Sequence, residues 1–166
     1  AIGLVAVWCF WHATTASALL GVLAYALACI VDHADGELAR LTFQESRLGA
    51  TLDWAIDTII QAGIVLGLGV SSGGTIMAVV GVLAAIGVTL SAVVTRYLPR
   101  EIEVDPTAGG LLTHIASRDV FYLVLLAFAA LLWLAPSLVF VVAVIVAAGS
   151  QGYWMRHLAR ICKPHP

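Results

Sequence analysis

Charged residues are scarce in this sequence. Only 8 Lys+Arg and 10 Asp+Glu occur among 166 residues, which is 11% of the chain. A soluble domain usually carries about 25% charged residues. So few charges cannot cover the surface of a water-soluble globule, and they exclude a disordered chain as well. The net charge of −2 also gives no basic field for binding nucleic acid.

Cysteine is scarce too. Cys9, Cys29 and Cys162 lie far apart, and no Cys-x2-Cys pair or Cys/His metal spacing is present. A secreted disulfide scaffold is therefore excluded, and buried structural thiols are expected. The chain starts at Ala1 inside an apolar stretch with no charged segment before it, which excludes a signal peptide. We expect a truncated helix here, preceded by residues that the sequence lacks.

Apolar residues dominate what remains. They make up 61% of the chain, and the mean hydropathy is +1.02. A bilayer core needs about 20 apolar residues per helix. Residues 1–11 are too few and indicate the tail of a cut span. The pattern predicts an all-α, polytopic membrane helical bundle that forms one domain over residues 1–166, with further spans at 13–31, 48–70, 75–95, 120–134 and 137–155.

The basic residues fall in three segments only. All eight lie in residues 32–48, 96–118 and 156–166, and the intervening turns have none. Cytoplasmic loops of membrane proteins are enriched in Lys and Arg. We therefore expect these three segments in the cytoplasm. Four of the arginines could either anchor the helices or line a pocket for an acceptor phosphate: Arg96, Arg100, Arg118 and Arg156.

Two pairs of aspartates stand at helical spacing. Asp32 and Asp35 are three residues apart at the end of one predicted span, and Asp53 and Asp57 are four apart in the next. Neighbours at these spacings share a helix face, so the pairs can converge. Clustered carboxylates in an apolar medium need protons or a cation. Oxygen ligands suit Mg²⁺ or Mn²⁺, and two ions would nearly neutralise four carboxylates.

Alternatives remain for each of these residues. A single intramembrane Asp can pair helices or relay protons, and the cluster could serve a cation or proton transporter. Arg40 could be a plain salt-bridge partner, and Gly49 could simply allow two helices to pack closely. The chain could also be a non-enzymatic membrane anchor of a larger protein. No internal repeat supports a transporter.

Eight residues at fixed spacings resemble the signature of the CDP-alcohol phosphotransferases, also called CDP-alcohol phosphatidyltransferases. The run is Asp32-x2-Asp35-Gly36-x2-Ala39-Arg40-x8-Gly49-x3-Asp53-x3-Asp57. The resemblance implies six transmembrane helices, with the first truncated here, and a homodimer. It also implies transfer of a substituted phosphate from a CDP-alcohol to an acceptor hydroxyl, with release of CMP, in phospholipid or related biosynthesis. The protein would lie in the cell membrane, with its active site at the cytoplasmic face.

The resemblance also assigns roles to residues. The four aspartates would hold two divalent cations, and Asp57, which lies deepest, would be the general base. Contacts to the CDP moiety would come from Gly36, Ala39, Arg40, Ser46 and Gly49. Some relatives carry an upstream nucleotidyltransferase domain, and this chain could do so as well.

The substrates stay open at this stage. Donor candidates are CDP-diacylglycerol and CDP-inositol, and acceptor candidates include glycerol phosphate, inositol phosphate and serine. Relatives that use inositol phosphate often have Arg directly after the last motif Asp, where this chain has Thr58. That departure argues against an inositol-phosphate acceptor.

Overall fold

Six helices make up the part of the chain that the structure, a computed structural model, describes: residues 2–12, 14–43, 46–71, 73–97, 118–134 and 136–161. No strand occurs among these residues. The all-α prediction is confirmed. The helices are α1 (Ile2–Trp11), α2 (Thr15–Leu41), α3 (Arg47–Ser71), α4 (Thr75–Tyr97), α6 (Arg118–Leu134) and α7 (Pro136–Ile161).

Four of the helices are long and apolar enough to cross a membrane: α2, α3, α4 and, over Leu138–Arg156, α7. Shorter apolar stretches occur in α1 and α6. These lengths and compositions indicate a multi-pass membrane protein. The predicted spans agree with the helices, but α2 continues well past residue 31. Its 27 residues would measure about 40 Å, more than the bilayer core of about 30 Å.

The helix ends have local chemical causes. The Thr14 hydroxyl accepts a hydrogen bond from the Ser17 backbone N–H, and the Ser17 side chain accepts one from Thr14, which forms a capping box for α2. Gly73, with φ of 78°, allows the tight turn between α3 and α4. Pro136 starts α7, where its missing N–H costs nothing. Short turns therefore force neighbouring helices to run antiparallel.

Small residues bring α3, α4 and α7 into close contact. A Cβ on Gly81 of α4 would lie 2.8 Å from the Gly69 Cα of α3. Gly87 meets Ser150 of α7, and the Ser91 hydroxyl of α4 donates to the Ser150 carbonyl at 3.0 Å. Without a hydrophobic driving force between helices in lipid, such close approach supplies much of the packing energy.

Helix α1 packs on α2 and α3 through a second set of small residues. The Trp11 indole lies against Gly67 and donates its Nε1–H to the Gly63 carbonyl at 3.0 Å. Gly63 and Gly67 of α3 therefore make room for α1 of the same chain. Beside them lies the main core, where the fully buried Phe10 and Ile64 meet residues of α2, α6 and α7.

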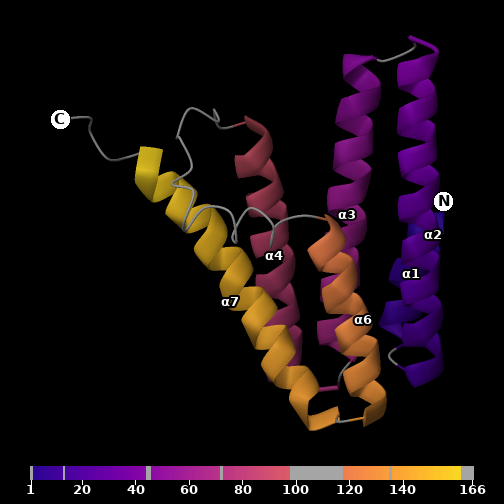
Figure 1. Ribbon diagram of the computed structural model, residues 1–166. Coiled ribbons are helices and arrows are strands. Elements are labelled where there is room, and N and C mark those ends of the chain that lie inside the picture. Colours follow the sequence, from indigo (N-terminus) through magenta and orange to yellow (C-terminus); the bar gives the residue numbers. More distant parts are fainter. Residues whose placement is uncertain are drawn as a thin grey trace.

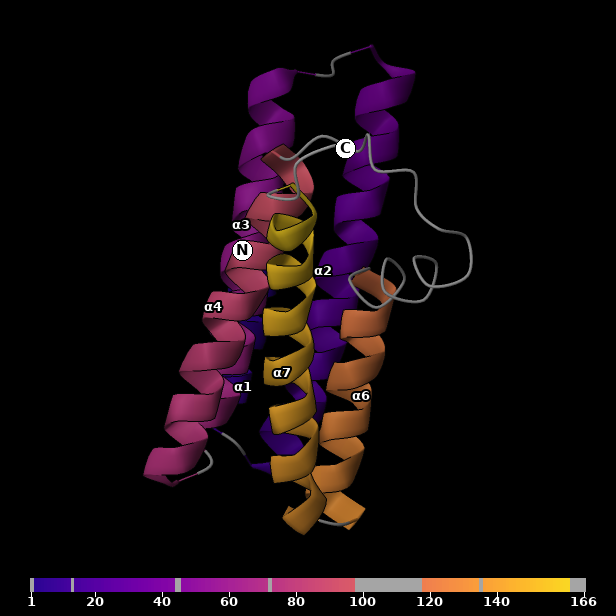
Figure 2. The same cartoon turned by 90° about the vertical axis from the view of Figure 1, so that its left-hand side faces the viewer.

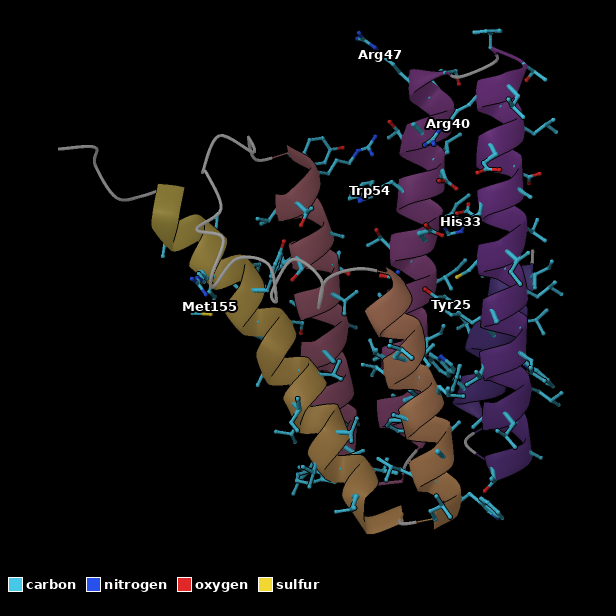
Figure 3. All side chains as sticks on the ribbon, in the orientation of Figure 1. Tyr25, His33, Arg40, Arg47, Trp54 and Met155 are labelled. Atoms are coloured by element: carbon cyan, nitrogen blue, oxygen red, sulfur yellow. The ribbon has the colours of Figure 1, made fainter. Side chains whose placement is uncertain are left out.

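The helices run side by side, with α2 joined to α3 at one end and the α3–α4 and α6–α7 turns at the other (Figure 1). The turned view shows α4, α7 and α6 in front of α2 and α3 (Figure 2). At the first end, α2 and α3 extend beyond α4 and α6. This end also carries Arg40 and Arg47 (Figure 3). The arrangement thus gathers charged residues at one end of the bundle.

Candidate active site

Three of the four motif aspartates converge. Asp32 of α2 and Asp53 and Asp57 of α3 each offer a carboxylate oxygen, and these oxygens all lie within 4.8 Å of one another. Asp32 and Asp57 are half-buried, whereas Asp53 is exposed. The α2–α3 hairpin causes the convergence because it sets the two motif segments side by side. Three oxygens at this separation fit the ligand set of a hard divalent cation.

Asp35 lies outside this group. It is on α2, three residues beyond Asp32, and it is exposed. A three-residue step on a helix rises about 4.5 Å and turns about 60° off the starting face. Asp35 is therefore nearer to the exposed end of the hairpin than the three clustered carboxylates are.

The residues expected to contact CDP follow on the same stretch of α2. Gly36 is exposed, and a Cβ placed there would meet nothing within 4 Å. Ala39 is half-buried, and the Arg40 side chain lies between α2 and α3 (Figure 3). All three residues are helical, although Arg40 was expected in a loop. The open space at Gly36 lies within one turn of Asp32 and Asp35 along the helix.

Ser46 and Gly49 start the second half of the site. The Ser46 hydroxyl accepts a hydrogen bond from the Gly49 backbone N–H at 2.9 Å, and its carbonyl accepts one from Ala50. Ser46 therefore caps α3. A Cβ on Gly49 would lie 3.0 Å from the Ser46 oxygen, so glycine leaves room for this cap. The cap sets where α3 begins and hence the position of Asp53 on it.

A pair of polar residues lies one turn deeper. Gln61 of α3 donates its side-chain N–H to the Tyr25 hydroxyl of α2 at 3.3 Å. Tyr25 is only 4% exposed, and its ring contacts Phe121 of α6 edge-on, with centroids 5.5 Å apart. The cluster of aspartates therefore has a polar layer beneath it.

Arg96 of α4 contacts the same stretch of α3 that carries Asp53. Its guanidinium donates to the Thr51 hydroxyl at 2.8 Å and lies 5.0 Å from the centre of the Trp54 ring. Thr51 and Trp54 lie on either side of Asp53 in α3. Of the other arginines named above, Arg156 is exposed on α7, whereas Arg100 and the side chain of Arg118 lie outside the described residues, as do Cys162 and the rest of residues 162–166.

Sequence reasoning missed Tyr25, Gln61 and the contacts of Arg96. A signal for Gln61 was present, since it follows Asp57 by four residues and so continues the aspartate face. Tyr25 precedes Asp32 by seven residues, which is also a same-face spacing. Their pairing across two helices could not be predicted from spacing within either helix.

Comparison with known proteins agrees with this geometry. No curated protein matches the chain. The family model of the CDP-alcohol phosphatidyltransferases matches residues 1–149, which include all the motif residues and reach into α7. The convergence of three motif aspartates and the match over nine-tenths of the sequence lead to one conclusion: the chain belongs to the CDP-alcohol phosphatidyltransferase family.

Proposed function

We propose that the protein transfers a substituted phosphate from a CDP-alcohol to an acceptor hydroxyl and releases CMP. The observation that carries this proposal is the convergence of Asp32, Asp53 and Asp57 at one end of the bundle. Family membership supports the reaction type. The donor would be CDP-diacylglycerol or CDP-inositol, and the product would enter phospholipid or related biosynthesis.

The carboxylates fit a pair of divalent cations such as Mg²⁺. Asp32, Asp53 and Asp57 would hold them together with Asp35, which the motif assigns to the same set. Their oxygen-only chemistry suits hard cations. Bound ions would neutralise the pyrophosphate of the donor and the charge on the departing CMP.

The CDP moiety would lie along the α2 end of the site. The open space beside Gly36 leaves room for the ligand to approach the helix backbone. Arg40 would pair with donor phosphate oxygens, because a guanidinium forms strong charge-assisted hydrogen bonds to them. Ala39, Ser46 and Gly49 would complete the contact, with Ser46 still capping α3.

Asp57 would move the proton. Its carboxylate takes the proton of the acceptor hydroxyl while the acceptor oxygen forms a bond to the phosphorus of the donor. The bond between that phosphorus and the CMP oxygen breaks, and CMP leaves with the electron pair. Such in-line transfer depends mainly on positioning and charge stabilisation, which the convergent side chains supply.

The functional molecule would be a homodimer, as the family resemblance implies, with its active site at the cytoplasmic face of the cell membrane. The single domain of residues 1–166 would carry the whole site. An upstream nucleotidyltransferase domain would supply the CDP-alcohol directly where one is attached. Arg96 and Arg156 are candidates for the acceptor-phosphate pocket.

The test is CMP release by the purified protein. CDP-diacylglycerol or CDP-inositol is supplied with an acceptor in Mg²⁺, and then with excess EDTA. We expect release in Mg²⁺, and its loss in EDTA and in Asp53→Asn, because both changes remove cation binding. Glu37→Gln, which neutralises an exposed carboxylate on α2, is the matched control and should keep its activity. Full turnover in EDTA would refute the cation requirement.

A further inference from the structure

The polar layer beneath the aspartates is built from two helices. Gln61 of α3 follows Asp57 by one turn, so the two side chains are neighbours with Cβ atoms about 5–6 Å apart. The Tyr25 hydroxyl of α2 accepts a hydrogen bond from the Gln61 side-chain N–H at 3.3 Å. The amide of Gln61 is therefore held next to Asp57, the proposed base.

Below this layer the interior is apolar. Tyr25 packs in one core cluster with Ile60, Ile64 and Leu125. Phe121, which supports the Tyr25 ring, also lines a small apolar cavity between α3, α4, α6 and α7. Tyr25 and Gln61 consequently close the polar site toward the membrane interior. A molecule that reaches Asp57 from the charged end would meet an amide and a phenol at the bottom.

The Tyr25 bond also fixes the orientation of the amide. Because Nε2 donates to the Tyr25 hydroxyl, Oε1 is the remaining acceptor. Within the described part of the chain, no hydrogen bond reaches Oε1. Among the described residues no buried side-chain polar atom lacks a partner, so this oxygen is accessible to a ligand. Polar residues inside membrane spans are functional candidates by default.

We propose that Gln61, oriented by Tyr25, accepts a hydrogen bond from a second hydroxyl of the acceptor and so selects small polyhydroxylated alcohols. This inference rests on the proposed transfer reaction and specifies its acceptor. The attacking hydroxyl lies at Asp57, and a hydroxyl on the adjacent carbon reaches the amide one turn below. An acceptor without that second hydroxyl leaves the amide oxygen unpaired, which is the strongest basis for discrimination between similar substrates.

The experiment compares two acceptors that differ in one hydroxyl. Glycerol 3-phosphate and 1,3-propanediol monophosphate are given to the full chain with Mg²⁺ and the CDP-alcohol that supports CMP release. The kcat/KM for each acceptor is measured, together with CMP release to water without acceptor. The variants are Gln61→Leu and Tyr25→Phe, which removes only the hydroxyl and keeps the ring on Phe121. Gln151→Leu is the control, because its amide also joins two helices, donating to the Leu83 carbonyl of α4 at 2.8 Å.

We expect wild type and Gln151→Leu to prefer glycerol 3-phosphate by about tenfold or more. Gln61→Leu should reduce that preference to within about twofold, and Tyr25→Phe should reduce it in part. A role in helix pairing alone would lower both kcat/KM values together and leave their ratio unchanged, which would overturn the inference. So would equal use of both acceptors by the wild type, or turnover with serine but with neither phosphate. If no CDP-alcohol releases CMP even to water, the proposed function itself has failed.

Discussion

Gly36 shows how a single residue can shape the site without touching any other side chain. The space beside it is open, so a methyl group there would meet no protein atom. Alanine also favours a helix over glycine by about 1 kcal/mol. We therefore expect Gly36→Ala to keep or raise thermal stability, yet to weaken CDP-alcohol binding by about tenfold, because the methyl group occupies space that the ligand needs.

The measurement for Gly36→Ala is donor affinity in Mg²⁺ alongside a thermal unfolding curve. Gly152→Ala is the matched control, since Gly152 of α7 also has open space around it but lies on another helix. It should leave donor affinity as in the wild type. Unchanged affinity in Gly36→Ala would show that the ligand does not approach the helix at this point.

Asp57 combines two roles in the proposal, and a substitution can separate them. Asp57→Asn keeps the size and one oxygen but removes the charge and the basicity. Loss of a general base typically costs about 10²–10⁴ in rate. Donor binding should fall less, because Asp32, Asp53 and Arg40 remain.

The two quantities for Asp57→Asn are CDP-alcohol affinity and single-turnover CMP release with acceptor present. A large drop in rate with a small drop in affinity is the expected result. Equal, large losses in both would make Asp57 a cation ligand only. Turnover near that of the wild type would remove the base assignment.

At the level of residues, the motif aspartates were predictable because spacing along a helix determines which side chains share a face. The convergence of Asp32 with Asp53 and Asp57 followed from two such faces on adjacent helices. The separation of Asp35 from this cluster could not be predicted in this way, because it depends on the rotation of α2 about its own axis. That rotation is set by packing against α1 and α6, which no local pattern encodes.

At the level of elements, α4 is held between α3 and α7 by contacts that a single methyl group would disturb. A Cβ on Gly81 would approach the Gly69 Cα and the Val65 carbonyl, at 2.8 and 3.2 Å. Both are backbone atoms that cannot turn aside. We expect Gly81→Ala to push α3 and α4 apart and to destabilise the protein by about 1–3 kcal/mol, as overpacking usually does.

Thermal unfolding in detergent measures the effect of Gly81→Ala. Gly149→Ala is the control, because a Cβ there meets nothing within 4 Å. It should be neutral or stabilising by up to about 1 kcal/mol through helix propensity alone. A Gly81→Ala protein as stable as Gly149→Ala would contradict the close packing of α3 on α4.

Helix α2 illustrates why element boundaries were less predictable than element types. Hydropathy falls at Asp32, so the predicted span stops there. The backbone hydrogen bonds of a helix do not depend on hydropathy, and the segment Glu37–Leu41 consists of good helix formers. The helix accordingly runs on to Leu41 and ends with the Thr42 N–H bonded to the Leu38 carbonyl. Its last turns carry the motif beyond the apolar stretch.

At the level of the whole molecule, the order in which the helices run up and down brings the charged segments to one end of the bundle. Antiparallel neighbours bring the α2–α3 connection, the end of α4 and the end of α7 to the same end of the bundle. The aspartate cluster and Arg96 lie toward that end, and the opposite turns carry no basic residue. The positions of the basic residues in the sequence predicted which helix ends lie together. They did not predict that α4 packs between α3 and α7, because that order depends on the close glycine contacts between these helices.

The side of the membrane on which the site lies can be measured directly. The proposed reaction uses a nucleotide-linked donor and releases CMP, and the positive-inside rule predicts that the α2–α3 connection lies in the cytoplasm. Thr42, exposed after α2, and Gly74, exposed before α4, mark opposite ends of the bundle. In a chain without its native cysteines, a membrane-impermeant maleimide added to intact cells should label Gly74→Cys and reach Thr42→Cys only after lysis. Labelling of Thr42→Cys from outside would invert the topology and put the aspartates out of reach of a cytoplasmic nucleotide, which contradicts the proposed reaction at that face.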